Sequence, residues 1–134
     1  MKKYLFVLTL LFSVSSFAQV EDTYTTNVKK AIALYKGEES LNNIASDLLA
    51  KMPQSKKSNP ALQKAIADTK QRTLNEAITH FRDKFSGDQI KEVIKDLSVK
   101  KQSYSGITNS FIRQWGISKR KYLTQISELY KKYQ

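Results

Sequence analysis

The chain has 134 residues, of which 23 are Lys or Arg and 12 are Asp or Glu, so its formal net charge is +11. It has no cysteine and one histidine, which excludes disulfides, thiolate metal sites, a cysteine nucleophile, a lipidated cysteine and multi-histidine metal sites. The length suits one small domain.

Residues 1–18 have the three-part layout of a secretory signal peptide. Two lysines open the segment, residues 4–14 (YLFVLTLLFSV) are apolar, and Ser16 and Ala18 place small residues at −3 and −1. The apolar run rises only about 16 Å as a helix, too short for a hydrocarbon core of about 30 Å. We therefore expect cleavage after Ala18, no transmembrane span afterwards, and a periplasmic or secreted protein whose residues 19–134 form one helical domain.

The first two helices are expected from apolar residues that recur every three or four positions. The first covers residues 22–36, and Gly37 is expected to end it by taking the left-handed conformation common after helix ends. The second ends at Pro53, and a polar linker follows over residues 54–59. Its apolar stripe comprises Leu41, Ile44, Ala45, Leu48 and Met52.

The next two helices have clear start signals. Asn59 is a good N-cap and Pro60 suits the first helical position, so a third helix is expected over residues 60–85. Ser86 and Gln89 have the spacing of a capping box for a fourth helix. The apolar residues of that fourth helix are Ile90, Val93, Ile94 and Leu97.

The last helical stretch is expected to begin near Gly106, after a polar segment at residues 100–105. Gly116 leaves two alternatives: a kink within one helix, or a turn after which Ser118 caps a fresh helix. The residues beyond have the spacing of a seam between packed helices: Tyr122, Ile126, Leu129 and Tyr133. No useful stretch alternates with period two. The expected fold class is therefore all-α, a small bundle of four to six helices preceded by a cleavable signal peptide.

The core of this bundle must stabilise the fold alone, because the chain cannot form a disulfide. Trp115 is expected at a packed edge, mostly but not wholly buried. The expected core residues are Val28, Ile32, Leu41, Ile44, Leu48, Leu62, Ile66, Leu74, Ile78, Phe81, Phe85, Ile90, Ile94, Leu97, Phe111, Ile126 and Leu129.

Catalytic chemistry has one candidate centre, His80, as a general base or single metal ligand. An alternative function is therefore a small hydrolase-like enzyme that uses His80 with Asp83 or Glu76. The sequence marks no nucleophile, no Glu-x-x-His or calcium-loop ligand signature and no glycine-rich phosphate loop. We expect a protein that is not an enzyme and has no metal or cofactor.

The basic excess is concentrated in residues 99–134, where Glu128 is the only acidic residue. A helix that begins at Ser118 places most of its cations away from its apolar stripe, so it is amphipathic with a cationic outer face. The candidate binding residues are Lys100, Lys101, Arg113, Trp115, Lys119, Arg120, Lys121, Lys131 and Lys132.

These residues predict a non-catalytic binding module that contacts an anionic envelope component or an acidic protein partner. The contact takes one of two forms: the terminal helix lies on an anionic membrane surface, or it holds its partner by counter-charge. Nucleic acid is disfavoured, because the protein is expected to be exported and its lysines suit point-charge contact better than base reading. The plain alternative is a solvated surface that keeps the protein soluble, and another is a structural protein that self-associates through the terminal stripe.

Two segments carry a family resemblance. Residues 30–52 (KAIALYKGEESLNNIASDLLAKM) read as a helix pair around a short Gly turn, and residues 81–97 (FRDKFSGDQIKEVIKDL) as an aromatic, a Ser cap and an apolar helix. They resemble segments of the small exported bacterial proteins of domain-of-unknown-function family 2059. That family's aromatic pair and small-Pro-x-Gly segment have no counterpart in residues 98–106 (SVKKQSYSG). The resemblance implies a helical exported domain and assigns no activity or functional residue.

Overall fold

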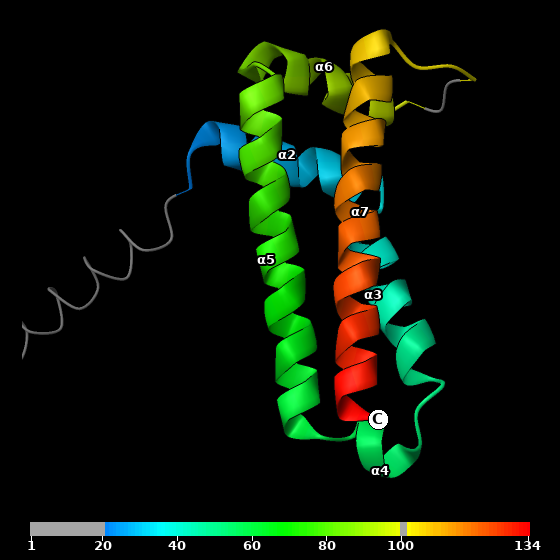
Figure 1. Cartoon of the computed structure of the whole chain (residues 1–134). Coiled ribbons are helices and arrows are strands. Elements are labelled where there is room, and N and C mark those ends of the chain that lie inside the picture. The colour runs from blue at the N-terminus through cyan, green and yellow to red at the C-terminus, as the bar shows by residue number, and fades with distance from the viewer. Residues whose placement is uncertain (1–20, 100–101) are drawn as a thin grey trace, which may run out of the picture.

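The computed structural model describes residues 21–99 and 102–134, which form six α-helices and no strand (Figure 1). The all-α bundle expected from the sequence is confirmed for these residues, whereas the predicted signal peptide lies outside them. The helices are α2 (Thr23–Leu34), α3 (Gly37–Leu49), α4 (Gln54–Lys57), α5 (Pro60–Lys84), α6 (Gly87–Leu97) and α7 (Gly106–Tyr133).

Helix α7 is the central element, because α5, α3 and α6 all pack on it. Helices α5 and α7 form a long antiparallel pair, and α3 runs beside the second half of α7 (Figure 1). Helices α2 and α6 pack on each other across the end of this pair where α5 finishes and α7 begins. The other end holds α4 and the C-terminus.

Side-chain caps set the helix starts that the sequence predicts. Asn59 caps α5, and Ser105 caps α7. At α6 both bonds of the capping box form: the Ser86 N–H donates to Gln89 Oε1 at 2.9 Å, and the Gln89 N–H donates to Ser86 Oγ at 3.2 Å. Each cap satisfies N–H groups that have no partner inside their own helix.

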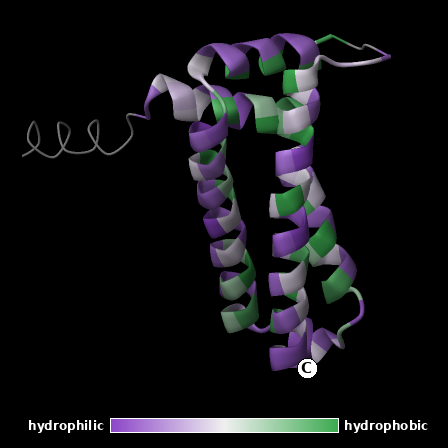
Figure 2. Ribbon diagram, turned by 45° about the horizontal axis from the view of Figure 1, so that its top comes forward, coloured by the Kyte–Doolittle hydropathy of each residue, from purple (hydrophilic) through white to green (hydrophobic). Residues whose placement is uncertain are grey.

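The core lies where α2, α5, α6 and α7 meet. The rings of Phe81 and Phe111 stack with centroids 4.4 Å apart and so join α5 to α7. Figure 2 shows hydrophilic residues over much of the outward sides of α5, α6 and α7. Every residue of the expected core is buried or packs half-buried against the buried residues. The half-buried members are Ile44, Leu48, Ile66, Leu74, Ile94, Leu97 and Leu129.

Gly37 does not end the first helix in the way that the sequence predicted. Lys36 takes the left-handed conformation (φ 57°, ψ 35°), and Gly37 begins α3. Glycine is needed at this position because a Cβ would lie 2.8 Å from Ile32 Cγ2 and 2.8 Å from Trp115 Cε2. The predicted boundary is therefore close to the observed one, but Lys36 takes the left-handed conformation, and the glycine at position 37 is required by close packing instead.

Two other local expectations change. The linker expected at residues 54–59 contains the short helix α4. The interpretation of Gly116 as a turn between two helices is wrong, since α7 is one helix from Gly106 to Tyr133. Trp115 and Tyr122 lie on either side of the glycine and are both buried, so packing on the bundle holds the helix through it.

A buried side chain, Asp96, which the sequence did not mark, joins the end of α6 to the start of α7. Asp96 is only 6% exposed. Its Oδ2 accepts a hydrogen bond from Thr108 Oγ1 at 2.7 Å and another from the Ser105 N–H at 3.1 Å. Through these two hydrogen bonds Asp96 ties the start of α7 to the end of α6.

A second carboxylate, Asp22, caps α2 and ties it to α5. Its Oδ1 accepts from the Thr25 N–H at 2.7 Å, and its Oδ2 accepts from Arg82 Nη2 at 2.9 Å. The hydrogen bond from the Thr25 backbone, followed by those from the Thr25 side chain and Arg82, lowers the pKa of Asp22 to about 2. The cap is therefore charged throughout the neutral range.

We expect Asp22 to make the fold less stable in acid. A carboxyl group whose pKa is lower in the folded state stabilises the fold fully above its unfolded pKa of about 3.9, and loses this contribution as the pH falls through the folded pKa. Asp22→Asn should therefore lower the melting temperature at pH 6, and the difference from the wild type should shrink towards pH 2. The matched control is Asp47→Asn, which removes an exposed carboxylate from α3. A difference that stays constant from pH 6 to pH 2 would contradict this assignment.

Candidate functional site

The cations expected on the terminal helix lie on the solvent side of α7. At about 100° per residue, Arg113, Arg120 and Lys131 fall within about 20° of one another, opposite the buried face. At about 1.5 Å per residue they span about 27 Å. We call these three residues the outer stripe of α7. The exposed cations of α7 are Arg113, Lys119, Arg120, Lys121, Lys131 and Lys132.

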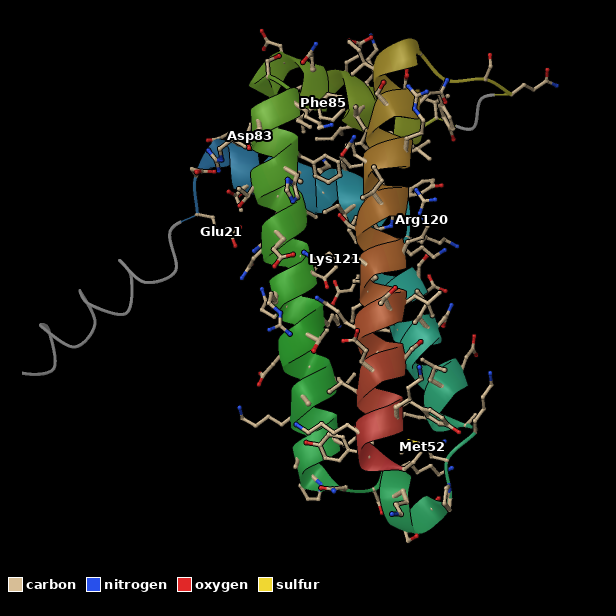
Figure 3. The ribbon with its side chains drawn as sticks, viewed as in Figure 1. Glu21, Met52, Asp83, Phe85, Arg120 and Lys121 are labelled. Carbon is tan, nitrogen blue, oxygen red and sulfur yellow. The ribbon has the colours of Figure 1, made fainter. Side chains whose placement is uncertain are left out.

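Lys121 differs from the other cations of α7 because it is used within the fold. Its Nζ donates to Glu76 Oε2 at 2.7 Å and links α7 to α5. This hydrogen bond is the main reason why the pKa of Glu76 lies below its ordinary value. Figure 3 shows Lys121 on the side of α7 that faces α5 and Arg120 on the opposite side. Part of the predicted charge is therefore already neutralised.

The outer stripe itself makes no ion pair within residues 21–99 and 102–134. Arg113 Nη2 donates to Ser110 Oγ at 3.1 Å, a neutral partner on the same helix. Three full positive charges are thus available along one side of α7. Lys100 and Lys101, which the sequence also proposed for binding, lie outside the described residues.

Trp115 is not part of this surface, and its predicted place at a packed edge is wrong. It is only 2% exposed and packs against Gly37 at the start of α3. It lies on the face of α7 opposite the outer stripe, so it cannot contact a partner while the fold is intact. Its Nε1 is buried without a hydrogen-bond partner among the described residues.

The apolar stripe of the terminal helix is also used inside the bundle. Tyr122 and Ile126 are buried, and Leu129 and Tyr133 are half-buried. A helix that lies on a membrane by its apolar face must insert that face between the lipids, which this packing prevents. The side of α7 that this packing leaves exposed is its charged outer face.

His80 is exposed on α5 and lines a hollow of about 40 Å³ with Glu76, Ser118 and three other residues. In the described part of the chain, no hydrogen bond joins its imidazole to Glu76, Asp83 or Ser118. The Glu76 carboxylate pairs with Lys121 instead. The geometry therefore contains no assembled acid–base pair at the one histidine.

A groove that the sequence did not predict runs between α3 and α5. Residues of α3 and α5 line a hollow of about 390 Å³. A second hollow, of about 220 Å³, is lined by residues of α2, α3 and α5. Glu38 and Gln71 line both hollows, and Lys70 Nζ pairs with Glu38 Oε1 at 2.8 Å across the groove. Only tertiary packing creates this feature, because its walls come from helices that are distant in sequence.

Comparison with protein-family models finds no match for this chain, and comparisons with curated proteins and with solved structures find none either. The resemblance to domain-of-unknown-function family 2059 stays a prediction. Of the helices in the described residues, none combines the length and the apolar composition needed to cross a bilayer.

Proposed function

We propose that this protein is a non-catalytic interaction module that binds an anionic partner through the outer face of α7. The partner is an acidic protein or an anionic polymer of the envelope, in keeping with the export expected from residues 1–18. The observation that supports the proposal is the outer stripe. Its three unpaired cations are aligned on a helix that the rest of the bundle holds in place.

Alignment on a rigid helix matters because a single exposed charge contact is weak. Such a contact contributes about 0–1 kcal/mol, and salt at physiological concentration screens charges over about 8 Å. Several cations presented together attract an anionic partner more strongly, and the bundle has already ordered the helix that carries them. Binding of this kind depends steeply on salt concentration.

The proposal is tested with a triple substitution, called the stripe variant: Arg113→Glu and Arg120→Glu in the outer stripe, and Lys119→Glu at the exposed cation next to Arg120 in the sequence. Lys121 is kept, because its loss would also break the pair with Glu76. With polyglutamate as the anionic probe, we expect the stripe variant to bind at least about tenfold more weakly than the wild type. Wild-type binding should also weaken steeply as salt rises from about 50 to 300 mM.

The matched control carries Lys30→Glu on α2 and Lys91→Glu and Lys95→Glu on α6. It changes the net charge of the protein by the same amount as the stripe variant does. All three lysines are exposed and make no ion pair among the residues described. Equal losses in the two variants would mean that only net charge matters. That result, or binding that salt leaves unchanged, would remove the proposed function.

A further inference from the structure

Lysines from three segments lie at the end of the bundle opposite α2 and α6. Lys51 follows α3, Lys56 and Lys57 belong to α4, and Lys131 and Lys132 lie in the last turn of α7. Figure 1 shows α4 beside the C-terminus at this end. We call these five lysines the basic end.

The core explains why these segments meet. Met52, Leu62 and Tyr130 line one apolar hollow, so the end of α3, the start of α5 and the last turns of α7 pack on one another. Met52, labelled at this end in Figure 3, is buried and directly follows Lys51. The Lys57 carbonyl accepts from Gln63 Nε2 at 2.6 Å, which holds α4 against α5. Packing, and not sequence proximity, therefore places these five lysines at the same end of the bundle.

The basic end also lacks counter-charge, a property that it shares with the outer stripe and with several other exposed lysines of the described residues. No ion pair within the described segments involves any of its five lysines, and Lys132 Nζ lies 5.6 Å from the centre of the Tyr133 ring. Elsewhere, four cations pair with carboxylates of other segments: Lys29 with Glu21, Lys70 with Glu38, Arg82 with Asp22 and Lys121 with Glu76. The charge of the basic end is thus left free for a partner outside the chain.

We infer that the basic end docks the protein on an anionic lipid bilayer, by contact with the headgroups. All five cations are lysines, whose flexible point charges suit mobile headgroups better than a fixed, forked arrangement does. Tyr130 and Tyr133 are half-buried at the same end, and tyrosine is enriched where proteins meet the membrane–water interface. The hollow that Tyr130 lines is only about 10 Å³, too small to hold a ligand, which favours contact with a surface over an inserted molecule.

This docking sets the orientation of the bundle and goes beyond the proposed function. At about 1.5 Å per residue along α7, Arg120 is about 16 Å and Arg113 about 27 Å from Lys131. Both distances exceed the screening length of about 8 Å at physiological salt. The two upper cations of the outer stripe therefore stay available to a second, soluble partner, while Lys131 belongs to both surfaces.

The test uses residues 19–134, which include all six described helices and their core and omit the apolar segment 4–14, itself able to bind lipid. Binding is measured by co-sedimentation with phosphatidylcholine vesicles that contain about 30% phosphatidylglycerol, and with pure phosphatidylcholine vesicles. We expect binding to the anionic vesicles alone. Lys51→Glu, Lys56→Glu and Lys57→Glu together should weaken it at least about tenfold, since one lysine near an anionic surface contributes about a fivefold factor.

The stripe variant and the control variant on α2 and α6 change the net charge by the same amount as the triple variant of Lys51, Lys56 and Lys57. Each should weaken vesicle binding by less than about threefold. A second variant, Lys131→Glu with Lys132→Glu, comes from a different segment and should also lose binding, which guards against a local folding defect in α4. Equal losses in the basic-end, stripe and control variants would overturn the inference, as would binding to neutral vesicles or no vesicle binding. Polyglutamate binding tests the proposed function, and vesicle binding tests the docking inference. Either proposal can therefore fail while the other holds.

Discussion

Replacing Trp115 with alanine is expected to lower the free energy of unfolding by about 3–5 kcal/mol. Trp115 is among the largest fully buried side chains, and its indole contacts the start of α3 from the middle of α7. Truncation removes apolar contacts with several helices and leaves a cavity that the surrounding rigid helices can fill only in part. The substitution should lower the stability of the fold and leave the charged residues of the outer stripe unchanged.

The control for this prediction is Ile117→Ala, two positions further along α7. Ile117 is 51% exposed, so its truncation should change the free energy of unfolding by less than about 0.5 kcal/mol. Denaturant unfolding followed by circular dichroism measures both variants, because Trp115 is the only tryptophan and its fluorescence is lost with it. Similar losses in the two variants would mean that the face of α7 bearing Trp115 is not the one that packs on the bundle.

Glycine at position 37 is expected to be required by packing, whereas glycine at position 116 is not. Gly37→Ala should destabilise the fold by about 1–3 kcal/mol, since the new methyl group would lie 2.8 Å from both Ile32 and Trp115. Gly116→Ala should stabilise it by about 0.5–1 kcal/mol, because alanine is the better helix former and, apart from the adjoining residues and backbone of α7, no atom lies within 4 Å of the added Cβ.

Thermal and denaturant unfolding of these two variants gives opposite signs if the packing is as described. The same chemical change is made at both positions and both lie within helices, so helix propensity alone predicts stabilisation in each case. A stabilised Gly37→Ala variant would mean that α3 does not approach α7 closely at its first residue.

The two proposed surfaces differ in how far the sequence could reveal them. A cationic outer face of the terminal helix was predicted, because spacing along one helix determines which side chains share a face. The sequence placed Lys121 on that face and did not group Arg113 with Arg120 and Lys131. The basic end was not predicted, because Lys51, Lys56 and Lys57 read as part of a helix end and a polar linker. Their relation to Lys131 and Lys132 depends on contacts between residues more than 70 positions apart, such as those around Met52 and Tyr130.

By itself the sequence determined the helical fold class, the starts of α5 and α6 and most of the core. Those features depend on interactions within a few residues: the caps at Asn59 and Ser86, and apolar side chains every three or four positions. Tertiary structure decided that α7 continues through Gly116, that Trp115 is buried and that Gly37 must be small. Whether a residue faces a neighbour or water depends on which helix covers it, and that is set by the packing of distant segments.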